Sequence, residues 1–223
     1  MNLFLWGALP YIAFTFLIVG TVVRFLYFER NWTTKSSEFL EKKQLRIANP
    51  LFHFGLLCVI GGHVVGVLIP KTWTAMMGID DHMYHQGALY MGAIAGLLFI
   101  AGFLLLMKRR FTVPAMKANT STTDKWLYLF LTLAIFSGMA GTLLNASGFF
   151  DYRVSIGPWF RSLLSFMPNP SLMEGVPFMF KFHMLAWMAV AILFPFTRLV
   201  HCLSVPLNYL TRPFIVYRKR DKF

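Results

Sequence analysis

The amino-acid sequence predicts an all-α membrane protein, a bundle of five transmembrane helices. Three observations lead to this prediction. Hydrophobic residues make up 57% of the 223 positions and charged residues only 13%, a composition typical of polytopic membrane proteins. Five apolar stretches each reach the length of about 20 residues that a helix needs to cross the hydrocarbon core. Most basic residues lie in the segments on one side of these stretches.

The five expected spans cover approximately residues 3–23, 49–69, 87–107, 126–146 and 182–203. Because every backbone amide in lipid must be bonded within its own segment, apolar stretches of this length form helices. The first stretch has no basic region before it, so we expect a retained span rather than a cleaved signal peptide. No internal repeat or soluble domain is visible, and we therefore expect one integral-membrane domain over residues 1–223.

The segment between the fourth and fifth spans, residues 147–181, is long and rich in proline and aromatic residues. It is compatible either with a short interfacial helix on the outer surface or with an irregular loop.

The positions of the basic residues predict the orientation. Lys and Arg concentrate on the cytoplasmic side of membrane proteins. Sixteen of them fall within residues 24–48, 108–125 and 204–223, whereas the opposite side has four, Lys71, Arg153, Arg161 and Lys181. The N-terminus should therefore face outside and the C-terminus the cytoplasm. The net charge of +12 follows this pattern, and no motif of a nucleic-acid reader accompanies it.

Four histidines occur as two pairs on separate spans. His53 and His63 lie on the second span, and His183 and His201 lie on the fifth. An imidazole in a lipid-facing segment is costly unless a partner satisfies it. Ten residues of helix correspond to about 15 Å, so His53 and His63 cannot share one metal ion. Since the two spans run in opposite directions, His63 should face His183 near the outside, and His53 should face His201 near the cytoplasm.

Two facing imidazole pairs predict two b-type haems. Ligation by two imidazoles occupies both axial positions of an iron, which favours electron transfer over oxygen chemistry. Zinc or copper is the competing interpretation, but tetrahedral zinc needs four donors together. Arg198, one turn before His201, is a candidate to bind a haem propionate, unless its side chain only extends to water.

The spacing on the fifth span requires an adjustment. On a continuous helix the 18 residues from His183 to His201 span about 27 Å, more than the separation on the second span. We expect a kink at Pro195 to absorb part of the difference, because proline bends a helix.

Small residues accompany the histidines of the second span. They would let either a flat macrocycle or a neighbouring helix approach the backbone closely. They are Gly55, Gly61, Gly62 and Gly66.

Several motifs resemble the gamma subunit of respiratory nitrate reductase. They are Asn49-Pro-Leu-Phe-His53, Gly62-His63, Leu106-Met-Lys-Arg-Arg110, Phe194-Pro-Phe-Thr-Arg-Leu-Val-His201, Ser204-Val-Pro206 and Tyr209-Leu-Thr-Arg212. The resemblance implies a cytochrome b anchor in the cytoplasmic membrane of a prokaryote. Such an anchor oxidises menaquinol or ubiquinol near the outer face and passes electrons to an iron-sulfur beta subunit and a molybdenum alpha subunit on the cytoplasmic side. It also implies that His63 and His183 hold the outer haem and that His53 and His201 hold the inner one.

The quinol site departs from this family pattern. Better-known members carry a lysine at the outer end of the third span, whereas residues 80–86 here read Asp-Asp-His-Met-Tyr-His-Gln. A carboxylate or an imidazole could accept the protons of quinol. The candidates for contact with quinol are Asp81, His82, Tyr84, His85 and Gln86.

Other functions remain open on the sequence alone. The chain could anchor a related sulfite or heterodisulfide reductase, or carry electrons towards quinone instead of away from it. A haem-free transporter is a further alternative, although no inverted repeat is evident. For the cytochrome, we expect the tail from Ser204 to Phe223 and the loop from Arg24 to Ala48 to dock the cytoplasmic partner.

Overall fold

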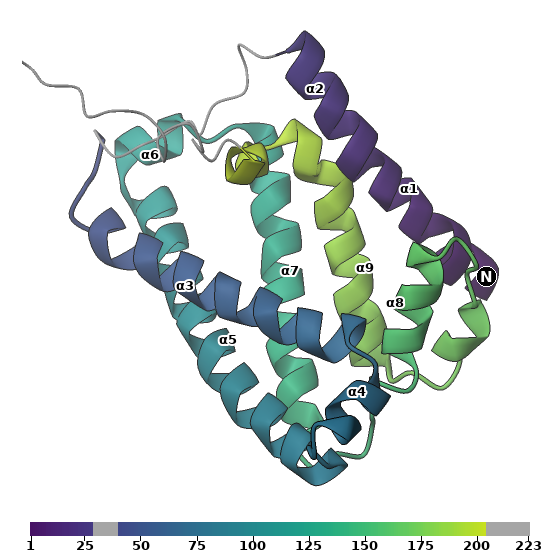
Figure 1. Cartoon of the computed structure of the whole chain (residues 1–223). Coiled ribbons are helices and arrows are strands. Elements are labelled where there is room, and N and C mark those ends of the chain that lie inside the picture. Colours follow the sequence, from purple (N-terminus) through teal and green to yellow (C-terminus); the bar gives the residue numbers. More distant parts are fainter. Residues whose placement is uncertain (29–39, 204–223) are drawn as a thin grey trace, which may run out of the picture.

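All regular elements in the described part of the chain are helical. The computed structural model describes residues 1–28 and 40–203, and no strand occurs within these two ranges (Figure 1). Five helices are long and apolar enough to cross a membrane: Phe4–Tyr27, Leu45–Leu68, Asp81–Thr112, Thr122–Leu144 and Phe178–Phe196. The prediction of an all-α protein with five membrane-spanning helices is therefore confirmed.

Several spans are assembled from consecutive helical pieces. The first span comprises η1 (Phe4–Ala8), α1 (Leu9–Thr15), η2 (Phe16–Gly20) and α2 (Thr21–Tyr27), and the second comprises α3 (Leu45–His63) and η4 (Val64–Leu68). The third and fourth are α5 (Asp81–Thr112) and α7 (Thr122–Leu144), preceded by the short helices α4 (Lys71–Met76) and α6 (Pro114–Ala118). After α8 (Ile156–Leu164) and η5 (Pro170–Met173), the fifth span consists of α9 (Phe178–Leu193) and η6 (Phe194–Phe196), with η7 (Arg198–Leu203) behind it.

Side-chain caps decide where α5 and α7 begin. Asp80 accepts a hydrogen bond from the backbone N–H of Met83 at 2.7 Å, so α5 starts at Asp81, six residues before the expected boundary. Ser121 and Asp124 form a reciprocal capping box at the start of α7, which satisfies amide groups that the first turn leaves unbonded.

The fifth span breaks before it reaches His201. The expected helix over residues 182–203 is wrong beyond Leu193, because Pro195 lacks the N–H that would continue the ladder and Thr197 is extended, with φ −118° and ψ −178°. His201 lies on the separate turn η7, and Figure 1 shows the chain turning aside at the end of α9. The separation of about 27 Å expected for a continuous helix therefore does not apply.

The helices pack as two close pairs. A Cβ atom built on Gly55 of α3 would lie 2.5 Å from the backbone N of Phe99, and one on Gly102 of α5 would lie 2.2 Å from that of Phe52, so α3 and α5 touch through their backbones. Helix α9 packs on α7, α5 also contacts α7, and α1 packs on α9. Among the described helices, α3 and α9 share few close backbone approaches, which leaves room between them for the side chains that they carry.

The segment 147–181 contains a helix that packs inward. Trp159 of α8 is 1% exposed and donates a hydrogen bond from Nε1 to the carbonyl of Trp6 at 2.8 Å. Arg161 donates to the carbonyl of Val67 at 2.8 Å, which satisfies an acceptor at the end of the second span. Helix α8 thus ties the first span to the second, and the alternative of an irregular loop is not observed.

We expect Gly102→Ala to destabilise the protein by about 1–3 kcal/mol, because the new methyl group would overlap the backbone of α3. Gly87→Ala is the matched control on the same helix, since a Cβ atom there would meet nothing within 4 Å. Thermal unfolding of the purified protein in detergent measures the difference. Equal melting temperatures for the two variants would contradict the close contact between α3 and α5.

Candidate functional site

The structure brings the four histidines of the spans together as two facing pairs. The ring centroids of His63 and His183 lie 5.8 Å apart, and those of His53 and His201 lie 6.3 Å apart. Figure 1 shows α4 and α6 at opposite ends of the bundle, which we name the α4 end and the α6 end. His63 is the last residue of α3, which leads through η4 into α4, so the His63–His183 pair is the one nearer the α4 end. The juxtaposition expected from the antiparallel spans is thus present.

Each of these imidazoles uses the same nitrogen for a hydrogen bond to a backbone carbonyl. The Nδ1 atoms lie 2.6–2.9 Å from carbonyl oxygens: His53 bonds Asn49, His63 bonds Val59, His183 bonds Ala134 and His201 bonds Arg198. A carbonyl only accepts, so Nδ1 carries the proton and Nε2 keeps a lone pair. This arrangement is typical of metal-binding histidines, whose second nitrogen donates to a carbonyl or carboxylate.

The spacing of the rings suits a metal between them. A metal–imidazole bond is about 2 Å long, so two imidazoles on opposite sides of one metal hold their ligating nitrogens about 4 Å apart and their ring centres somewhat farther. Each pair supplies only two donors, and no group of three or more His, Cys, Asp or Glu side chains suited to a metal occurs in the described residues. A macrocycle that brings four nitrogens of its own fits this donor set better than a bare ion.

Helix α7 forms a cradle for His183. The Nδ1 atom of His183 also lies 3.3 Å from Oγ of Ser137, and a Cβ atom on Gly138 would lie 2.7 Å from Cε1 of the ring. The imidazole can therefore rest against the backbone of α7 only because residue 138 is glycine. Sequence reasoning missed this glycine, since nothing local indicates which face of the fourth span meets His183.

The four glycines of the second span have different surroundings. Gly55 permits the contact between α3 and α5, whereas a Cβ atom on Gly66 would lie 2.9 Å from the ring of Tyr152. Gly61 and Gly62 directly precede His63 at the end of α3. A Cβ atom on either glycine would meet nothing within 4 Å. Open space beside His63 is compatible with a macrocycle there, and Gly55 serves helix packing.

Arg198 is bound to a carboxylate of α7. Its Nε and Nη2 atoms donate to the two oxygens of Asp124 at 2.9 and 2.6 Å, and Asp124 is 2% exposed. A haem propionate at Arg198 would therefore join an existing ion pair. The sequence places Asp124 and Arg198 on the same side of the membrane, but it does not determine that their side chains meet.

A balanced group of charges occupies the α4 end. Lys71 contacts Asp81 at 2.6 Å and Asp151 at 3.0 Å, while Arg153 contacts Asp81 at 3.0 Å and Asp151 at 3.2 Å. Two cations and two anions thus alternate in a closed group, which we call the α4-end charge ring. It joins α4, the first turn of α5 and the loop before α8.

The quinol candidates lie on the first turns of α5, on two faces. Asp81 belongs to the charge ring, and the ring of Tyr84 lies 3.7 Å below the guanidinium of Arg153. His85 donates from Nε2 to the carbonyl of Ala146 at 3.0 Å, so its Nδ1 keeps the lone pair. The remaining two candidates, His82 and Gln86, are four residues apart, which places them together on a neighbouring face.

Sequence reasoning missed four residues around these candidates. Lys71, Asp151, Tyr152 and Arg153 complete the surroundings of Tyr84, whose hydroxyl lies 3.5 Å from that of Tyr152. The available signal was the equal number of acidic and basic residues, four of each, in the segments 69–86 and 147–181 that connect the spans at the α4 end.

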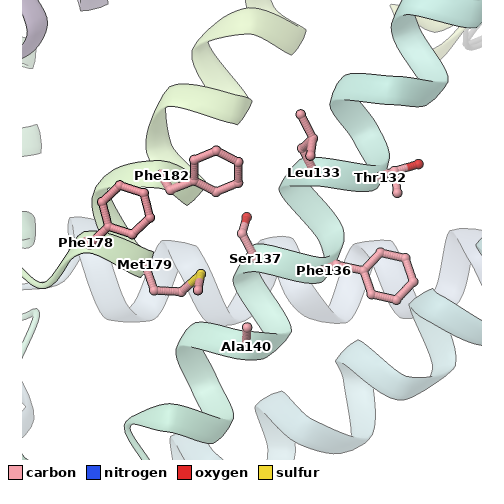
Figure 2. A pocket seen from close by; sticks show the side chains of 8 residues that line it. All are labelled: Thr132, Leu133, Phe136, Ser137, Ala140, Phe178, Met179 and Phe182. Atoms are coloured by element: carbon pink, nitrogen blue, oxygen red, sulfur yellow. The ribbon is translucent and has the colours of Figure 1, made fainter.

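An apolar groove runs along α7 and α9 on the surface of the bundle (Figure 2). It has a volume of about 340 Å³ and is lined by Thr132, Leu133, Phe136, Ser137, Ala140, Phe178, Met179 and Phe182. Ser137 lies on the side of α7 that faces α9, and it is also the residue that contacts His183. The groove therefore reaches the surroundings of the His63–His183 pair from the lipid-facing side.

The charge ring shifts the pKa of two groups outside the spans. Burial would raise the pKa of Asp151, but hydrogen bonds from Lys71 and from the backbone of Arg153 outweigh it, so the pKa lies below its ordinary value. Hydrogen bonds to Asp81 and Asp151 raise the pKa of Lys71. Both groups are therefore charged across the neutral pH range.

We expect Asp151→Asn to lower the melting temperature at pH 7 by about 2–4 °C, the effect of about 1 kcal/mol in a chain of this size. A depressed folded-state pKa means that the carboxylate stabilises the fold above its unfolded-state pKa of about 4 and loses this effect as the pH falls further. Thermal unfolding between pH 3 and 7 tests this. The difference from wild type should narrow below about pH 4, and a constant difference would show that the charge of Asp151 is not responsible.

Comparisons with known proteins identify the family of this chain. The family model of the nitrate reductase gamma subunit matches residues 2–220. The chain is 49% identical to the nitrate reductase gamma chain of Bacillus subtilis, over 97% of this chain and 98% of that one. It is 31% identical to the respiratory nitrate reductase 1 gamma chain of Escherichia coli, over 99% and 98%. It is also 41% identical to the nitrate reductase-like protein NarX of Mycobacterium tuberculosis, over 97% of this chain and 34% of NarX. The chain belongs to the nitrate reductase gamma subunit family and is a multi-pass membrane subunit of a prokaryotic respiratory nitrate reductase.

Proposed function

We propose that this subunit is a dihaem cytochrome b that oxidises membrane quinol at the α4 end and delivers electrons at the α6 end for nitrate reduction. The observation that carries the proposal is the pair of facing imidazole pairs, with centroids 5.8 and 6.3 Å apart and every Nδ1 bonded to a carbonyl. Four nitrogens are thereby left to ligate two irons.

The proposed ligands follow from this geometry. His63 and His183 hold one haem b at the α4 end, and His53 and His201 hold a second at the α6 end. Bound there, the two haems supply one-electron redox chemistry at both ends of the bundle. The protein contributes the spacing of the rings, the tautomer of each imidazole and an apolar surrounding, which together favour a fixed low-spin site without an open position for oxygen.

The orientation places the α4 end outside and the α6 end at the cytoplasm. Its support is the excess of Lys and Arg in the segments that connect the spans at the α6 end. The cytoplasmic partners are then an iron-sulfur beta subunit and a molybdenum alpha subunit. Of the surfaces expected to dock them, the tail 204–223 and residues 29–39 lie outside the described residues.

Quinol, as menaquinol or ubiquinol, would bind beside the His63–His183 pair near the first turns of α5. Asp81, His82, Tyr84, His85 and Gln86 are the candidates for contact. His85 can take a proton, because its Nδ1 lone pair is not used by the hydrogen bond to Ala146. Asp81 is instead held by two cations, which favours the ionised carboxylate and makes it a weaker base.

Arg198 is the candidate for a propionate of the haem at the α6 end. Its ion pair with Asp124 uses Nε and Nη2, and a guanidinium has a further nitrogen with two donors. Arg110 lies close enough to influence it electrostatically, so positive charge exceeds negative charge at this position.

Substitution of the histidines tests the pairing. His63→Ala or His183→Ala should remove one low-spin haem b signal and abolish quinol oxidation, while His53→Ala or His201→Ala should remove the other signal. Reduced-minus-oxidised absorption spectra of membranes measure both species. If the His63 and His201 variants lost the same signal, the pairing would be wrong, and if wild type had no reducible haem b, a haem-free transporter would be favoured.

The whole reaction is tested in the complex purified with its cytoplasmic subunits. Quinol should reduce both haems, and nitrate should then reoxidise them. Reoxidation by sulfite or a heterodisulfide but not by nitrate would assign the cytochrome to a different acceptor.

His85→Gln should slow reduction of the haems by quinol by about 10²-fold, the usual contribution of a positioned proton acceptor, and should leave both haem spectra unchanged. Met83→Leu is the control, because Met83 is exposed on the same turn and has no group that accepts a proton. Stopped-flow reduction of the complex measures the rates. A His85 variant as fast as the control would exclude His85 as the acceptor.

A further inference from the structure

His201 differs from the other three proposed ligands in the element that carries it. His53, His63 and His183 lie within α3 and α9, whereas His201 lies on η7, a turn of six residues beyond the break at Thr197. A short 3-10 turn has few internal hydrogen bonds and poor bond geometry. Contacts from other helices must therefore hold His201 in place.

The main external contact is the one between Asp124 and Arg198, the residue whose carbonyl supports the imidazole of His201. Arg198 forms its two hydrogen bonds to Asp124 at 2.9 and 2.6 Å, and the carbonyl of the same Arg198 accepts from Nδ1 of His201 at 2.6 Å. A paired guanidinium and carboxylate has a defined geometry because two parallel bonds form at once. The position of Arg198 thus fixes the acceptor for His201.

Asp124 is itself held rigidly at the start of α7. Its Oδ2 accepts from the backbone N–H of Ser121 at 3.1 Å, and its own N–H donates to Oγ of Ser121 at 3.2 Å. The carboxylate therefore cannot rotate freely to follow the turn η7. It is a fixed point on α7 to which η7 is attached.

A second contact restrains the break itself. Arg24 of α2 donates to the carbonyl of Thr197 at 2.9 Å and to that of Pro195. It thereby hydrogen-bonds to carbonyls at the break between η6 and η7. This contact holds the start of the turn, while Asp124 holds the turn beside His201.

We propose that Asp124 is a positioning residue for the iron ligand His201, acting through Arg198 without touching the haem. The proposal rests on the proposed function, in which His201 ligates the haem at the α6 end. Asp124 sets the direction of the His201 ring and thereby the strength of its bond to the metal. Groups in this outer position tune metal affinity and redox potential in other metalloproteins.

The experiment uses Asp124→Asn in the complete complex, since asparagine keeps the size and the capping ability of the residue but loses the charge that pairs with Arg198. In Asp124→Asn we expect the α6-end haem, which is the one that His201→Ala removes, to be bound about tenfold more weakly than in wild type. Its redox potential should shift and its low-spin EPR signal should change. The haem of the His63–His183 pair should keep its potential and its signal. Redox titration and EPR of the two species provide readouts that do not depend on nitrate reduction.

Three further variants separate positioning from general stability. Asp151→Asn makes the same substitution in the α4-end charge ring and should leave the potential and EPR signal of the α6-end haem unchanged. Asp124→Glu keeps a carboxylate and should restore part of the signal lost in Asp124→Asn. If Asp124→Asn does not assemble, Arg198→Lys decides, because lysine keeps the charge but loses the two parallel bonds and should alter the same haem.

The outcomes distinguish this proposal from the function on which it rests. Wild type without two haem b species would overturn the proposed function. If wild type has two haems and the α6-end haem is unchanged in Asp124→Asn, the role of Asp124 is overturned while the proposed function stands. If Asp124→Asn does not assemble, an unchanged α6-end haem in Arg198→Lys leads to the same conclusion. Equal changes in both haems would also overturn it, because they would indicate a general loss of packing.

Discussion

The interaction on which the rest of the structure depends is the facing of imidazoles across the space between α3 and α9. An unsatisfied imidazole in an apolar helix is costly, and here each ring has its Nδ1 bonded to a carbonyl while its centroid lies about 6 Å from that of a partner ring. Rings at this distance neither stack nor bond each other. In lipid, a Nε2 lone pair without a donor costs free energy, and the proposed haems would use these lone pairs.

The packing of the other helices keeps α3 and α9 apart. Helix α3 is fixed to α5 by a backbone contact that Gly55 and Gly102 permit, and α9 is fixed to α7, where Gly138 accommodates the ring of His183. Each histidine-bearing helix thus has its own close neighbour, which holds it in place while its histidines face those of the other helix. In lipid, such contacts between small residues replace the hydrophobic driving force that water would provide.

Charged side chains are paired with opposite charges at both ends of the bundle. At the α4 end, two cations and two anions alternate around Asp81 and Asp151, and at the α6 end Asp124 pairs with Arg198. A buried charge is tolerated only when it is paired and hydrogen-bonded. These pairs also connect elements that are distant in sequence, so they restrain the loops and turns next to the two histidine pairs.

The sequence by itself determined the number of spans and the pairing of the histidines, because both follow from local quantities: the length of each apolar stretch and the position of each histidine along antiparallel helices. Only the tertiary structure decided that α9 stops at Leu193, that Asp124 holds Arg198 and that Gly138 makes room for His183. Each of these depends on which faces of distant helices meet. Pro195 indicated a kink, but the direction of the turn behind it is set by two residues of other helices. Arg24 lies 171 residues from Pro195, and Asp124 lies 74 residues from Arg198. A pattern along one chain segment does not contain that long-range information.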